Sequence, residues 1–545
     1  MPLVTVNFKD LGQISGLDKD IVLENISMIG AEIERVGEDS VDLEFFPNRP
    51  DLYSVEGVAR ASRTFIGNKR GLLRYEVEKP EFHIKLSEEV KSVRPILGCA
   101  VVKDVKLDEN AIVSLMDLQE DLHWALGRGR KKVSIGVHDI RNIYPPFSYE
   151  TENPDFEFIP LDYTEKMSMK KILEEHPKGI KFAEIVSGMD RYPIIKDSKG
   201  NVLSFPPIIN GTLTTVTENT KDIFIDVTGT SKEVYLALNI VVAALYERGG
   251  KITGVEIINP DNTKIITPDM RATQRTVTLK EIKDLSGIEI TEEEVIESLN
   301  KMGYDASCEN LNNEIIFNVL VPAYRADIIH NADIIEDIVI GYGYRNVKTL
   351  KSKAYTVGKE HKHSKNRQIA CEIMVGLGFN QVMPFTLTNE KIHFENMQKE
   401  VEPGITYVKH PITREQTMVR SDLLPGLLEI LALNRHRELP QKIFEVGDVV
   451  KNKKNKQKIA AVSIHHFANF TEISELVDAF LRELSVDYEL EKSKNPSYLK
   501  GRRADIIING KKRGTFGELD PAVITAFELG HAVIGFEADL EEIMK

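Results

Sequence analysis

The segment VPAYRADIIHNADIIEDIVIGYGY, residues 321–344, decides how the middle of this chain is interpreted, as the end of a strand followed by a helix. On a helix that advances about 100° per residue, Asp333, Glu336 and Asp337 share one arc, opposite the isoleucines. Asp327 precedes the helix and adds a fourth carboxylate, giving the oxygen donors that a hard divalent cation such as Mg²⁺ prefers. A solvated acidic helix face explains the same spacing, so the pattern alone leaves both interpretations open.

The residues just before this segment carry clear helix punctuation. In TEEEVIESLNKMGYDA, residues 291–306, Thr291 and Glu294 form a capping box, and Gly303 ends the helix. A strand pattern, EIIFNVLV, then leads into the acidic segment. Together these elements predict a small helix and strand domain over residues 274–350.

Further outward, the chain predicts three more parts. The pattern over residues 1–85 predicts an α/β module in which Gly30 ends a helix and Asp51 caps the next one. Residues 90–268 are richer in β-branched strands, with two interrupting helices, and predict a mixed α+β domain. A polar, basic stretch at residues 348–365 reads as a linker, and residues 355–545 alternate strands and helices. The expected fold class is therefore α+β multidomain.

Composition narrows the possible functions. The chain has 545 residues, and 70 basic against 84 acidic residues give a net charge of −14, so any RNA contact must be a local patch. Its three cysteines, Cys99, Cys308 and Cys371, are too far apart for a zinc knuckle or a disulfide framework. We find no targeting segment and no apolar stretch of about 18 residues, and expect a cytoplasmic protein without a membrane partner.

Two basic segments each allow two interpretations. GRGRKK, residues 127–132, is either a phosphate contact or a helix end whose cations complement the helix dipole. KNKKNKQK, residues 451–458, is either a solvated hairpin tip, which we favour, or an RNA contact. The chain lacks a nucleophile elbow, a phosphate-binding loop and a His-Glu-x-x-His motif, which removes the usual support for a hydrolase, nucleotide triphosphatase or zinc enzyme.

Several strings occur in an order that resembles one known family. They are PNRPDLYSVEGVARA (47–61), the unit 276–304, the segment 321–344, MVRSDLLPGLL (418–428) and FGELDPAVI (516–524). Together they resemble the β subunit of phenylalanyl-tRNA synthetase across essentially the whole chain. The length is similar to the short form of archaea and eukaryotes, without the oligonucleotide-binding and anticodon-binding modules of bacterial β subunits.

The resemblance implies a subunit of an aminoacyl-tRNA synthetase. It implies that the β chain supports ATP-dependent attachment of phenylalanine to tRNA(Phe) on an α subunit, as a tetramer of two α and two β chains. It favours Mg²⁺ at Asp327, Asp333, Glu336 and Asp337. The final domain is similar to the catalytic, antiparallel-sheet fold of class II synthetases, but only Arg420 looks like a remnant of its second motif, and the arginine of the third motif is not visible.

Residues 90–268 resemble the family's editing module, which hydrolyses mischarged Tyr-tRNA(Phe). A site for phenylalanine cannot strongly reject tyrosine, so a second site that selects for the added hydroxyl is the physical remedy. Candidate editing residues are Ser204, Asn210, Asn219, Asp226 and Thr228. Capping and turn roles explain these residues equally well. Two alternatives remain: a tRNA-binding scaffold without turnover, and a free-standing hydrolase of mischarged tRNA.

Overall fold

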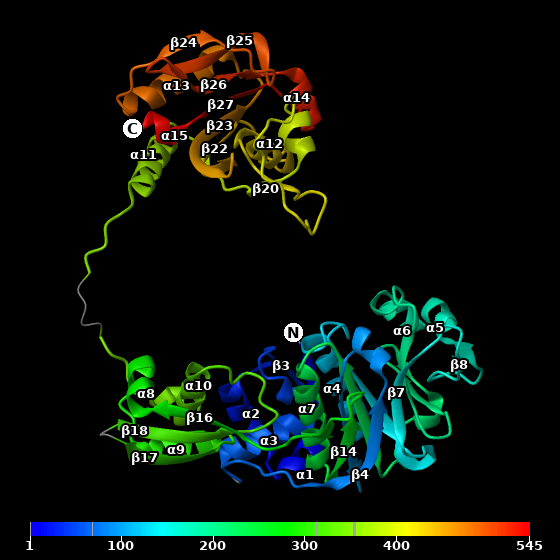
Figure 1. The fold of residues 1–545 in the computed structure, drawn as a ribbon. Coiled ribbons are helices and arrows are strands. Elements are labelled where there is room, and N and C mark those ends of the chain that lie inside the picture. The colour runs from blue at the N-terminus through cyan, green and yellow to red at the C-terminus, as the bar shows by residue number, and fades with distance from the viewer. Residues whose placement is uncertain (1, 68, 312–313, 352–355) are drawn as a thin grey trace. The chain divides into compact units, whose positions relative to one another are not determined.

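The computed structural model of the protein describes residues 2–67, 69–311, 314–351 and 356–545. The chain divides into two compact units, Met1–Leu350 and Lys351–Lys545, each built on its own sheets (Figure 1). The expected linker at 348–365 contains residues 352–355, and the expected last domain begins at residue 355; these four positions lie outside the described residues. The protein is a multidomain α+β chain, as its sequence predicts.

The first unit opens with a three-stranded antiparallel sheet in the order β1-β3-β2. Its elements are β1 (Leu3–Asn7), α1 (Phe8–Ser15), α2 (Lys19–Asn25), β2 (Ala31–Val36), β3 (Ser40–Phe45) and α3 (Val55–Ile66). Gly30 ends the helical stretch after α2 with a φ of 92°, as predicted. The prediction that Asp51 caps the next helix is wrong, because Ser54 caps α3 while Asp51 is buried and binds Arg49.

A ten-stranded mixed sheet follows, in the order β12-β11-β10-β7-β4-β14-β5-β13-β6, with β15 added beside β14. The strands are β4 (Val77–Leu86), β5 (Ile96–Lys103), β6 (Val133–Asp139), β7 (Phe147–Glu152), β10 (Tyr192–Lys196), β11 (Val202–Phe205), β12 (Ile209–Asn210), β13 (Ile223–Gly229), β14 (Lys251–Ile258) and β15 (Lys264–Thr267). The connections contain α4 (Glu109–Ala125), β8 (Glu157–Phe158), β9 (Met167–Ser168), α5 (Met169–Glu175), α6 (Pro177–Phe182) and α7 (Glu233–Glu247). Strand β4 pairs in parallel with β14 and β7, and the other pairs are antiparallel.

The central strands of this sheet are buried on both faces. Because side chains alternate along a strand, Ile225 and Val227 of β13 face a core that contains α4 and α7. Phe224 of β13 faces a second core with Cys99 and Phe147 on the other side of the sheet. This alternation places Asp226 of β13 on the same side as Phe224. A charged side chain thus lies in the middle of a buried strand.

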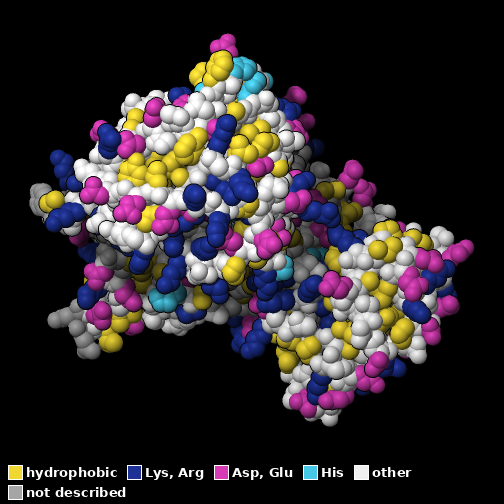
Figure 2. Space-filling view, turned by 90° about the horizontal axis from the view of Figure 1, so that it is seen from above, with side chains coloured by type: hydrophobic (Ala, Val, Ile, Leu, Met, Phe, Trp, Pro, Cys, Tyr) yellow, Lys and Arg dark blue, Asp and Glu magenta, His cyan; other side chains and the backbone are white. Residues whose placement is uncertain are grey.

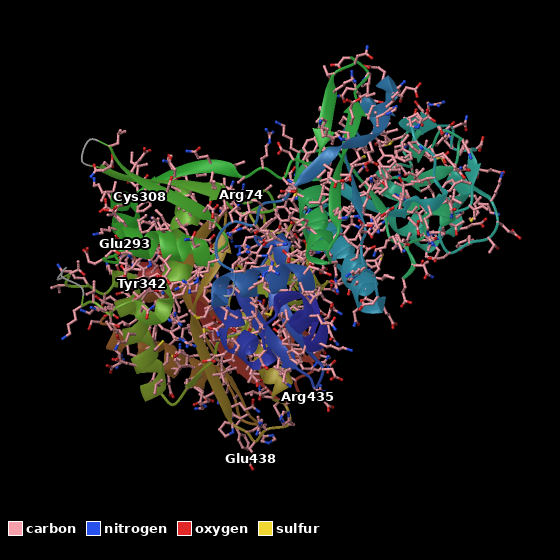
Figure 3. The ribbon with its side chains drawn as sticks, turned by 90° about the horizontal axis from the view of Figure 1, so that it is seen from below. Arg74, Glu293, Cys308, Tyr342, Arg435 and Glu438 are labelled. Atoms are coloured by element: carbon pink, nitrogen blue, oxygen red, sulfur yellow. The ribbon has the colours of Figure 1, made fainter. Side chains whose placement is uncertain are left out.

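The small domain after this sheet has three antiparallel strands in the order β16-β18-β17. Its elements are β16 (Thr273–Thr278), α8 (Leu279–Ser286), α9 (Glu292–Lys301), β17 (Asp305–Leu311), β18 (Glu314–Val321) and α10 (Asn331–Tyr342). The predicted capping box of Thr291 and Glu294 is present at the start of α9. Figure 3 marks the domain by Glu293, Cys308 and Tyr342, and Arg74 reaches Asp305 of β17 from the preceding segment.

The second unit contains a seven-stranded sheet in the order β19-β22-β23-β27-β26-β25-β24, antiparallel except for β19 against β22. The strands are β19 (Asn380–Gln381), β22 (Gln441–Lys451), β23 (Lys454–Ile464), β24 (Glu489–Lys492), β25 (Tyr498–Ile508), β26 (Lys511–Leu519) and β27 (Val533–Ala538), beside the small pair β20 (Leu387–Thr388) and β21 (Met418–Val419). The helices are α11 (Lys362–Gly376), α12 (Leu424–Leu433), α13 (Phe470–Glu483), α14 (Pro521–Ala526) and α15 (Leu540–Ile543).

Both faces of the seven-stranded sheet are covered. Ala461 of β23 packs into a core with α11 and α13, whereas its neighbour Val462 packs into a core with α12 and α14. The basic segment 451–458 forms the tip of the β22–β23 hairpin, where Asn452 and Lys453 have φ values of 54° and 60°. The prediction of a hairpin tip is confirmed.

The surface seen in Figure 2 mixes basic and acidic side chains, with hydrophobic groups among them. This mixture fits a chain whose net charge does not by itself attract nucleic acid. Among the described residues, no helix has both the length and the apolar character that crossing a bilayer requires.

Candidate functional site

The two ends of the ten-stranded sheet meet at a pocket. Strand β12 begins the order and β6 ends it, and no backbone ladder joins these two strands within the described residues. Asn210 of β12 instead donates from Nδ2 to the carbonyl of Val137 on β6, at 3.2 Å. Ser204 of β11 lies 3.4 Å from Asp226 on β13 through its hydroxyl. Side chains therefore connect the two ends, and the space between them stays open as a pocket.

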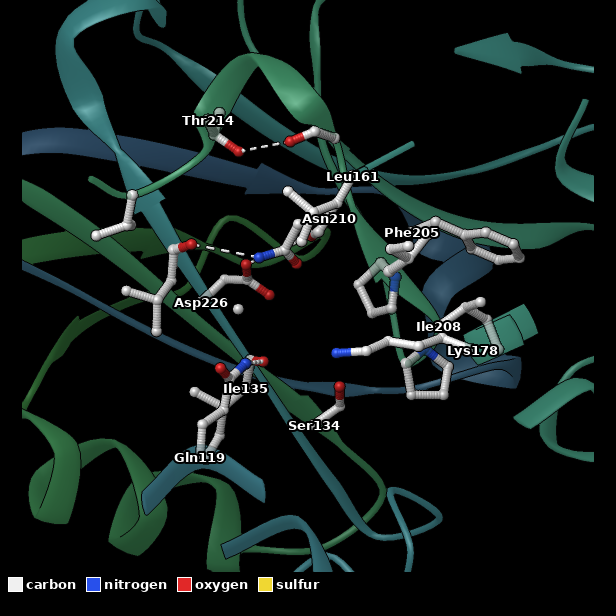
Figure 4. Close-up of a pocket in the computed structure, with 18 of the residues that line it drawn as sticks. Gln119, Ser134, Ile135, Leu161, Lys178, Phe205, Ile208, Asn210, Thr214 and Asp226 are labelled. Carbon is white, nitrogen blue, oxygen red and sulfur yellow. Dashed lines mark hydrogen bonds between the residues drawn. The ribbon is translucent and has the colours of Figure 1, made fainter. Parts of the chain in front are cut away.

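The pocket has a volume of about 140 Å³ and a largely apolar wall. Its apolar lining comes from Ile112, Met116, Ile135, Val137, Leu161, Phe205, Pro206, Pro207, Ile208, Ile209 and Val216. Its polar lining comes from Gln119, Arg130, Ser134, Lys178, Ser204, Asn210, Thr214, Thr215 and Asp226. In Figure 4 the ammonium end of Lys178 points into the pocket, with Asp226 and Ser134 around it. An apolar space with a few convergent polar groups is the usual form of a small-ligand site.

Asp226 is the buried acid of this pocket, only 1% exposed. Its Oδ2 lies 2.6 Å from His138 Nε2 and accepts the Ser204 hydroxyl at 3.4 Å. Its Oδ1 makes no hydrogen bond to the described part of the chain. Asp226 lines the pocket, and its Oδ1 is not among the fully buried, unpartnered side-chain atoms of the described residues, so this oxygen borders open space. It can therefore accept a hydrogen bond from a ligand.

The basic segment GRGRKK has a structural role at its centre. Arg130 is 5% exposed, pairs with Glu120 at 2.6 Å, and donates to the carbonyls of Pro207 and Ile208. These bonds hold the loop that forms one wall of the pocket. The guanidinium of Arg130 thus bonds mainly within the fold, through its two terminal nitrogens. A phosphate contact through the segment 127–132 stays a prediction. Arg128 is exposed at the surface of the same turn.

The structure brings three of the five candidate editing residues together and leaves two outside. Ser204, Asn210 and Asp226 line the pocket. Asn219 is an exposed loop residue outside the lining. Thr228 is fully buried, and its hydroxyl accepts from the Nε of Arg94 at 3.2 Å, away from the lining.

Sequence reasoning missed His138, which lies behind Asp226, and Lys178, which projects into the pocket. The histidine and the aspartate are 88 residues apart, so only the strand register brings them together. One available signal was Gly136 inside the strand pattern KVSIGVHDI, because a glycine within a strand often marks close approach of another group.

Three of the four carboxylates in the acidic segment 321–344 form hydrogen bonds within the fold, which the residue spacing alone does not indicate. Arg325 is buried, and its guanidinium bonds both oxygens of Asp327 and the Oδ2 of Asp337. Tyr304 also donates its hydroxyl to Asp337. Asp333 accepts two backbone N–H groups at the start of α10, at 2.8 and 2.6 Å. Of the four carboxylates, only that of Glu336 belongs to an exposed residue, so the alternative of a solvated acidic face does not hold for the buried Asp337.

The donor chemistry of this cluster fits a hard cation, although its geometry is not that of a closed cage. Burial and the nearby charges of Asp337 and Asp333 raise the pKa of Glu336, which shows that negative charges crowd here. No three of the four carboxylates bring oxygens within 4.8 Å of one another; among the described residues only Glu32, Glu34 and Glu44 do so. Asp333 and Asp337 each keep one oxygen outside the hydrogen bonds of the described chain.

In the second unit, Arg420 is bonded internally. Its guanidinium makes a two-pronged contact with Glu445 of β22, at 2.6 and 3.0 Å, and both side chains are buried. Nearby, Lys458 bonds Asp422 at 2.6 Å and Glu537 at 2.8 Å. These cations are neutralised by the fold, so they do not form an open site for a triphosphate.

The matched family models are those of tRNA synthetases. They are the B3/4 domain over residues 81–259, the tRNA synthetase B5 domain over 275–344, and the phenylalanyl tRNA synthetase beta chain CLM domain over 347–540. The fold and its sites thus define a subunit of an aminoacyl-tRNA synthetase.

The whole chain is 57% identical to the phenylalanine–tRNA ligase beta subunit of Methanosarcina barkeri and 56% identical to that of Methanosarcina acetivorans, covering 100% of this chain and 99% of each relative. An N-terminal fragment of the phenylalanyl-tRNA synthetase beta subunit from Pyrococcus horikoshii is 39% identical, with a TM-score of 0.59, over 63% of this chain and all of that fragment. The chain belongs to the family of phenylalanine–tRNA ligase beta subunits, and the resemblance inferred from its sequence is confirmed.

Proposed function

We propose that this chain joins an α subunit, as two α and two β chains in the cytosol, to attach phenylalanine to tRNA(Phe) at the expense of ATP. The α subunit carries the synthetic site in this proposal, because Arg420 is occupied by Glu445. Apolar side chains of the second unit support an α-subunit contact: Met383, Phe385 and Ile412 are 82, 83 and 99% exposed. The division into domains at 1–85, 90–268, 274–350 and 355–545 stays a prediction.

The chemistry proposed for the β chain itself is hydrolysis of Tyr-tRNA(Phe) at the pocket between β6, β11, β12 and β13. The observation that carries it is the open Oδ1 of buried Asp226 in a pocket whose wall combines apolar and polar side chains. A tyrosyl hydroxyl donates to this oxygen, whereas a phenylalanyl ring would bury it without a donor. In the reaction, water adds its hydroxyl to the ester carbon and its proton goes to the ribose oxygen, releasing tyrosine and intact tRNA.

Asp226→Asn tests this proposal in the co-expressed α and β chains. The amide keeps the shape of the carboxylate but weakens the acceptor, so hydrolysis of chemically prepared Tyr-tRNA(Phe) should fall on the order of 100-fold. Attachment of phenylalanine should stay within about twofold, since the α subunit performs it. Loss of both activities together would instead indicate that Asp226 supports only the fold.

The same assay separates the alternatives. If the wild-type complex does not accelerate hydrolysis of Tyr-tRNA(Phe) over the rate in buffer, editing is wrong and the scaffold is favoured. If the β chain alone hydrolyses Tyr-tRNA(Phe) as fast as the complex, the free-standing hydrolase is favoured. Phenylalanine attachment by the β chain alone would overturn the assignment of the synthetic site to the α subunit.

Mg²⁺ is proposed at the acidic cluster, held by Asp333, Glu336 and Asp337 together with Asp327. Desolvation, followed by the charges of Asp337, Asp333 and Asp327, raises the pKa of Glu336. These neighbouring carboxylates support the site, because a divalent cation relieves their repulsion. Bound there, the ion supplies charge neutralisation, and Arg325 remains the internal partner of Asp327 and Asp337.

Glu336→Gln tests the cation site without removing a buried contact, since Glu336 is exposed. Adding Mg²⁺ at about ten times its Kd should stabilise the wild-type complex by about 1.4 kcal/mol, and this gain should be lost in the variant. Thermal unfolding and calorimetric titration with MgCl₂ give the measurement. Glu293→Gln, on α9, is the control and should keep the gain. An equal Mg²⁺ response in Glu336→Gln would contradict the site.

A further inference from the structure

A buried histidine stands directly behind the acid of the proposed hydrolytic pocket. His138 of β6 has no exposed surface and is absent from the pocket lining. Its Nε2 lies 2.6 Å from Oδ2 of Asp226, and its Nδ1 lies 2.8 Å from the hydroxyl of Thr214. The imidazole is therefore held at both nitrogens, between the acid on one side and a pocket-lining hydroxyl on the other.

The strand register shows that this contact depends on a missing side chain. Gly136, not His138, lies directly opposite Asp226 in the pairing of β6 with β13, and His138 lies opposite Phe224. The imidazole reaches Asp226 diagonally, across the position of Gly136. A Cβ at Gly136 would lie 2.2 Å from Oδ2 of Asp226 and 2.7 Å from Nε2 of His138. Glycine is thus required here for the acid and the imidazole to meet.

The two hydrogen-bond contacts of the Asp226 side chain are both made by one of its oxygens. His138 and Ser204 both form hydrogen bonds with Oδ2, whereas Oδ1 has no such partner among the described residues and borders the pocket. A carboxylate held at one oxygen by a fixed imidazole cannot rotate to exchange the two. The His138 ring is itself fixed, because Phe224 packs near it with ring centroids 6.1 Å apart and Thr214 holds Nδ1.

We infer that His138 is a positioning residue of the hydrolytic pocket, fixing Asp226 so that Oδ1 faces the hydroxyl of a bound tyrosyl group. This inference rests on the proposed editing function. A histidine that merely satisfies a buried acid would support folding without affecting the choice between tyrosine and phenylalanine. A positioning histidine affects that choice, since only the tyrosyl group uses Oδ1.

The test compares hydrolysis of Tyr-tRNA(Phe) and Phe-tRNA(Phe) by the α and β complex. In His138→Ala, the ratio of the two kcat/KM values should fall about 30-fold, because Asp226 is free to turn. His138→Gln places an amide donor near the position of Nε2 and should restore the ratio to within about fivefold of the wild type. Thermal unfolding and attachment of phenylalanine report whether each complex is folded.

His123→Ala is the matched control. His123 is also buried in the first unit, and its Nε2 accepts the backbone N–H of Ile135 on β6 at 2.8 Å, yet it does not contact Asp226. The control should lose stability while keeping the tyrosine preference within about threefold.

Three outcomes are distinguishable. A wild-type complex without tyrosine preference overturns the editing proposal itself. A wild-type preference that survives in His138→Ala overturns only the positioning role. A preference lost equally in His138→Ala and His138→Gln, with both complexes folded, also overturns that role, because the restored donor would then make no difference.

Discussion

In the pocket of the first unit a buried carboxylate, Asp226, keeps one oxygen without a partner, whereas in the second unit Arg420 and Glu445 satisfy each other. Each region buries an acid in a strand of a sheet, Asp226 in β13 and Glu445 in β22. A hydrogen-bond acceptor without a donor can bind a ligand that supplies one, whereas an ion pair whose members satisfy each other stabilises only the fold. The difference shows that the first unit holds a pocket suited to a ligand, whereas the buried charges of the second unit stabilise only the fold.

Breaking the Arg420–Glu445 pair gives the largest expected effect. Arg420→Met leaves Glu445 buried without its partner and should destabilise the second unit by about 3 to 5 kcal/mol in urea unfolding. Replacing both residues by Met should cost much less, because no charge is then left buried. Neither variant should change ATP binding by the β chain. A drop in phenylalanine attachment in a fully stable Arg420→Met complex would show that the arginine still serves a nucleotide.

The stability of the second unit should depend on pH through the buried His393. Burial lowers the pKa of His393 to about 4, and its Nε2 accepts the N–H of Ser421 at 3.2 Å. Between about pH 6.5 and about pH 4 the unfolded chain holds a proton that the folded chain lacks, so stability falls as the pH falls. Between pH 7 and pH 5 this histidine should cost about 2 kcal/mol.

His393→Gln, which keeps an acceptor, should remove most of that loss. Urea unfolding followed by far-ultraviolet circular dichroism at the two pH values measures the difference between the wild type and the variant. The fluorescence of Trp124, the single tryptophan and part of the first unit, should respond equally in both proteins. An identical pH response by circular dichroism would show that His393 is not the group involved.

Substituting two asparagines, one inside the pocket and one outside it, should change the hydrolysis of Tyr-tRNA(Phe) only modestly and should show how far the pocket extends. Asn210 joins β12 to β6, so Asn210→Ala should lower Tyr-tRNA(Phe) hydrolysis about tenfold. Asn219 is exposed and outside the lining, so Asn219→Ala should stay within about twofold. Single-turnover hydrolysis by the complex measures both. Equal losses would mean that the active region extends beyond the pocket described.

Sequence signals that involve only neighbouring residues, such as helix caps and turns, predict the local structure correctly in most of these cases. The capping box at Thr291 and the turn at Asn452 depend on residues within a few positions of each other, and both are present. The predicted N-cap of α3 is wrong because Asp51 and Ser54 are both residues that favour this position. Asp51 instead bonds Arg49, a contact that the capping pattern does not indicate.

Contacts between distant residues had no such signal. Asp226 was a candidate because of its residue type, but its pairing with His138 depends on strand register. Likewise, helical spacing groups Asp337 with Asp333 and Glu336 on one arc, but it does not indicate that Asp337 is buried against Arg325 of the preceding loop. Periodicity describes one element at a time, and these sites are made by two or more.

The junction between β12 and β6 has a mechanical consequence. Parting two neighbouring strands elsewhere in this sheet breaks a row of backbone hydrogen bonds, whereas these two ends are joined by side-chain contacts. Those contacts are Asn210 with Val137, Arg130 with the loop before β12, His138 with Thr214, and Ser204 with Asp226. The junction is therefore the line along which the sheet yields at the lowest energy. It borders the pocket, so we expect local opening of the sheet to begin there and to widen the pocket before it disrupts the paired strands.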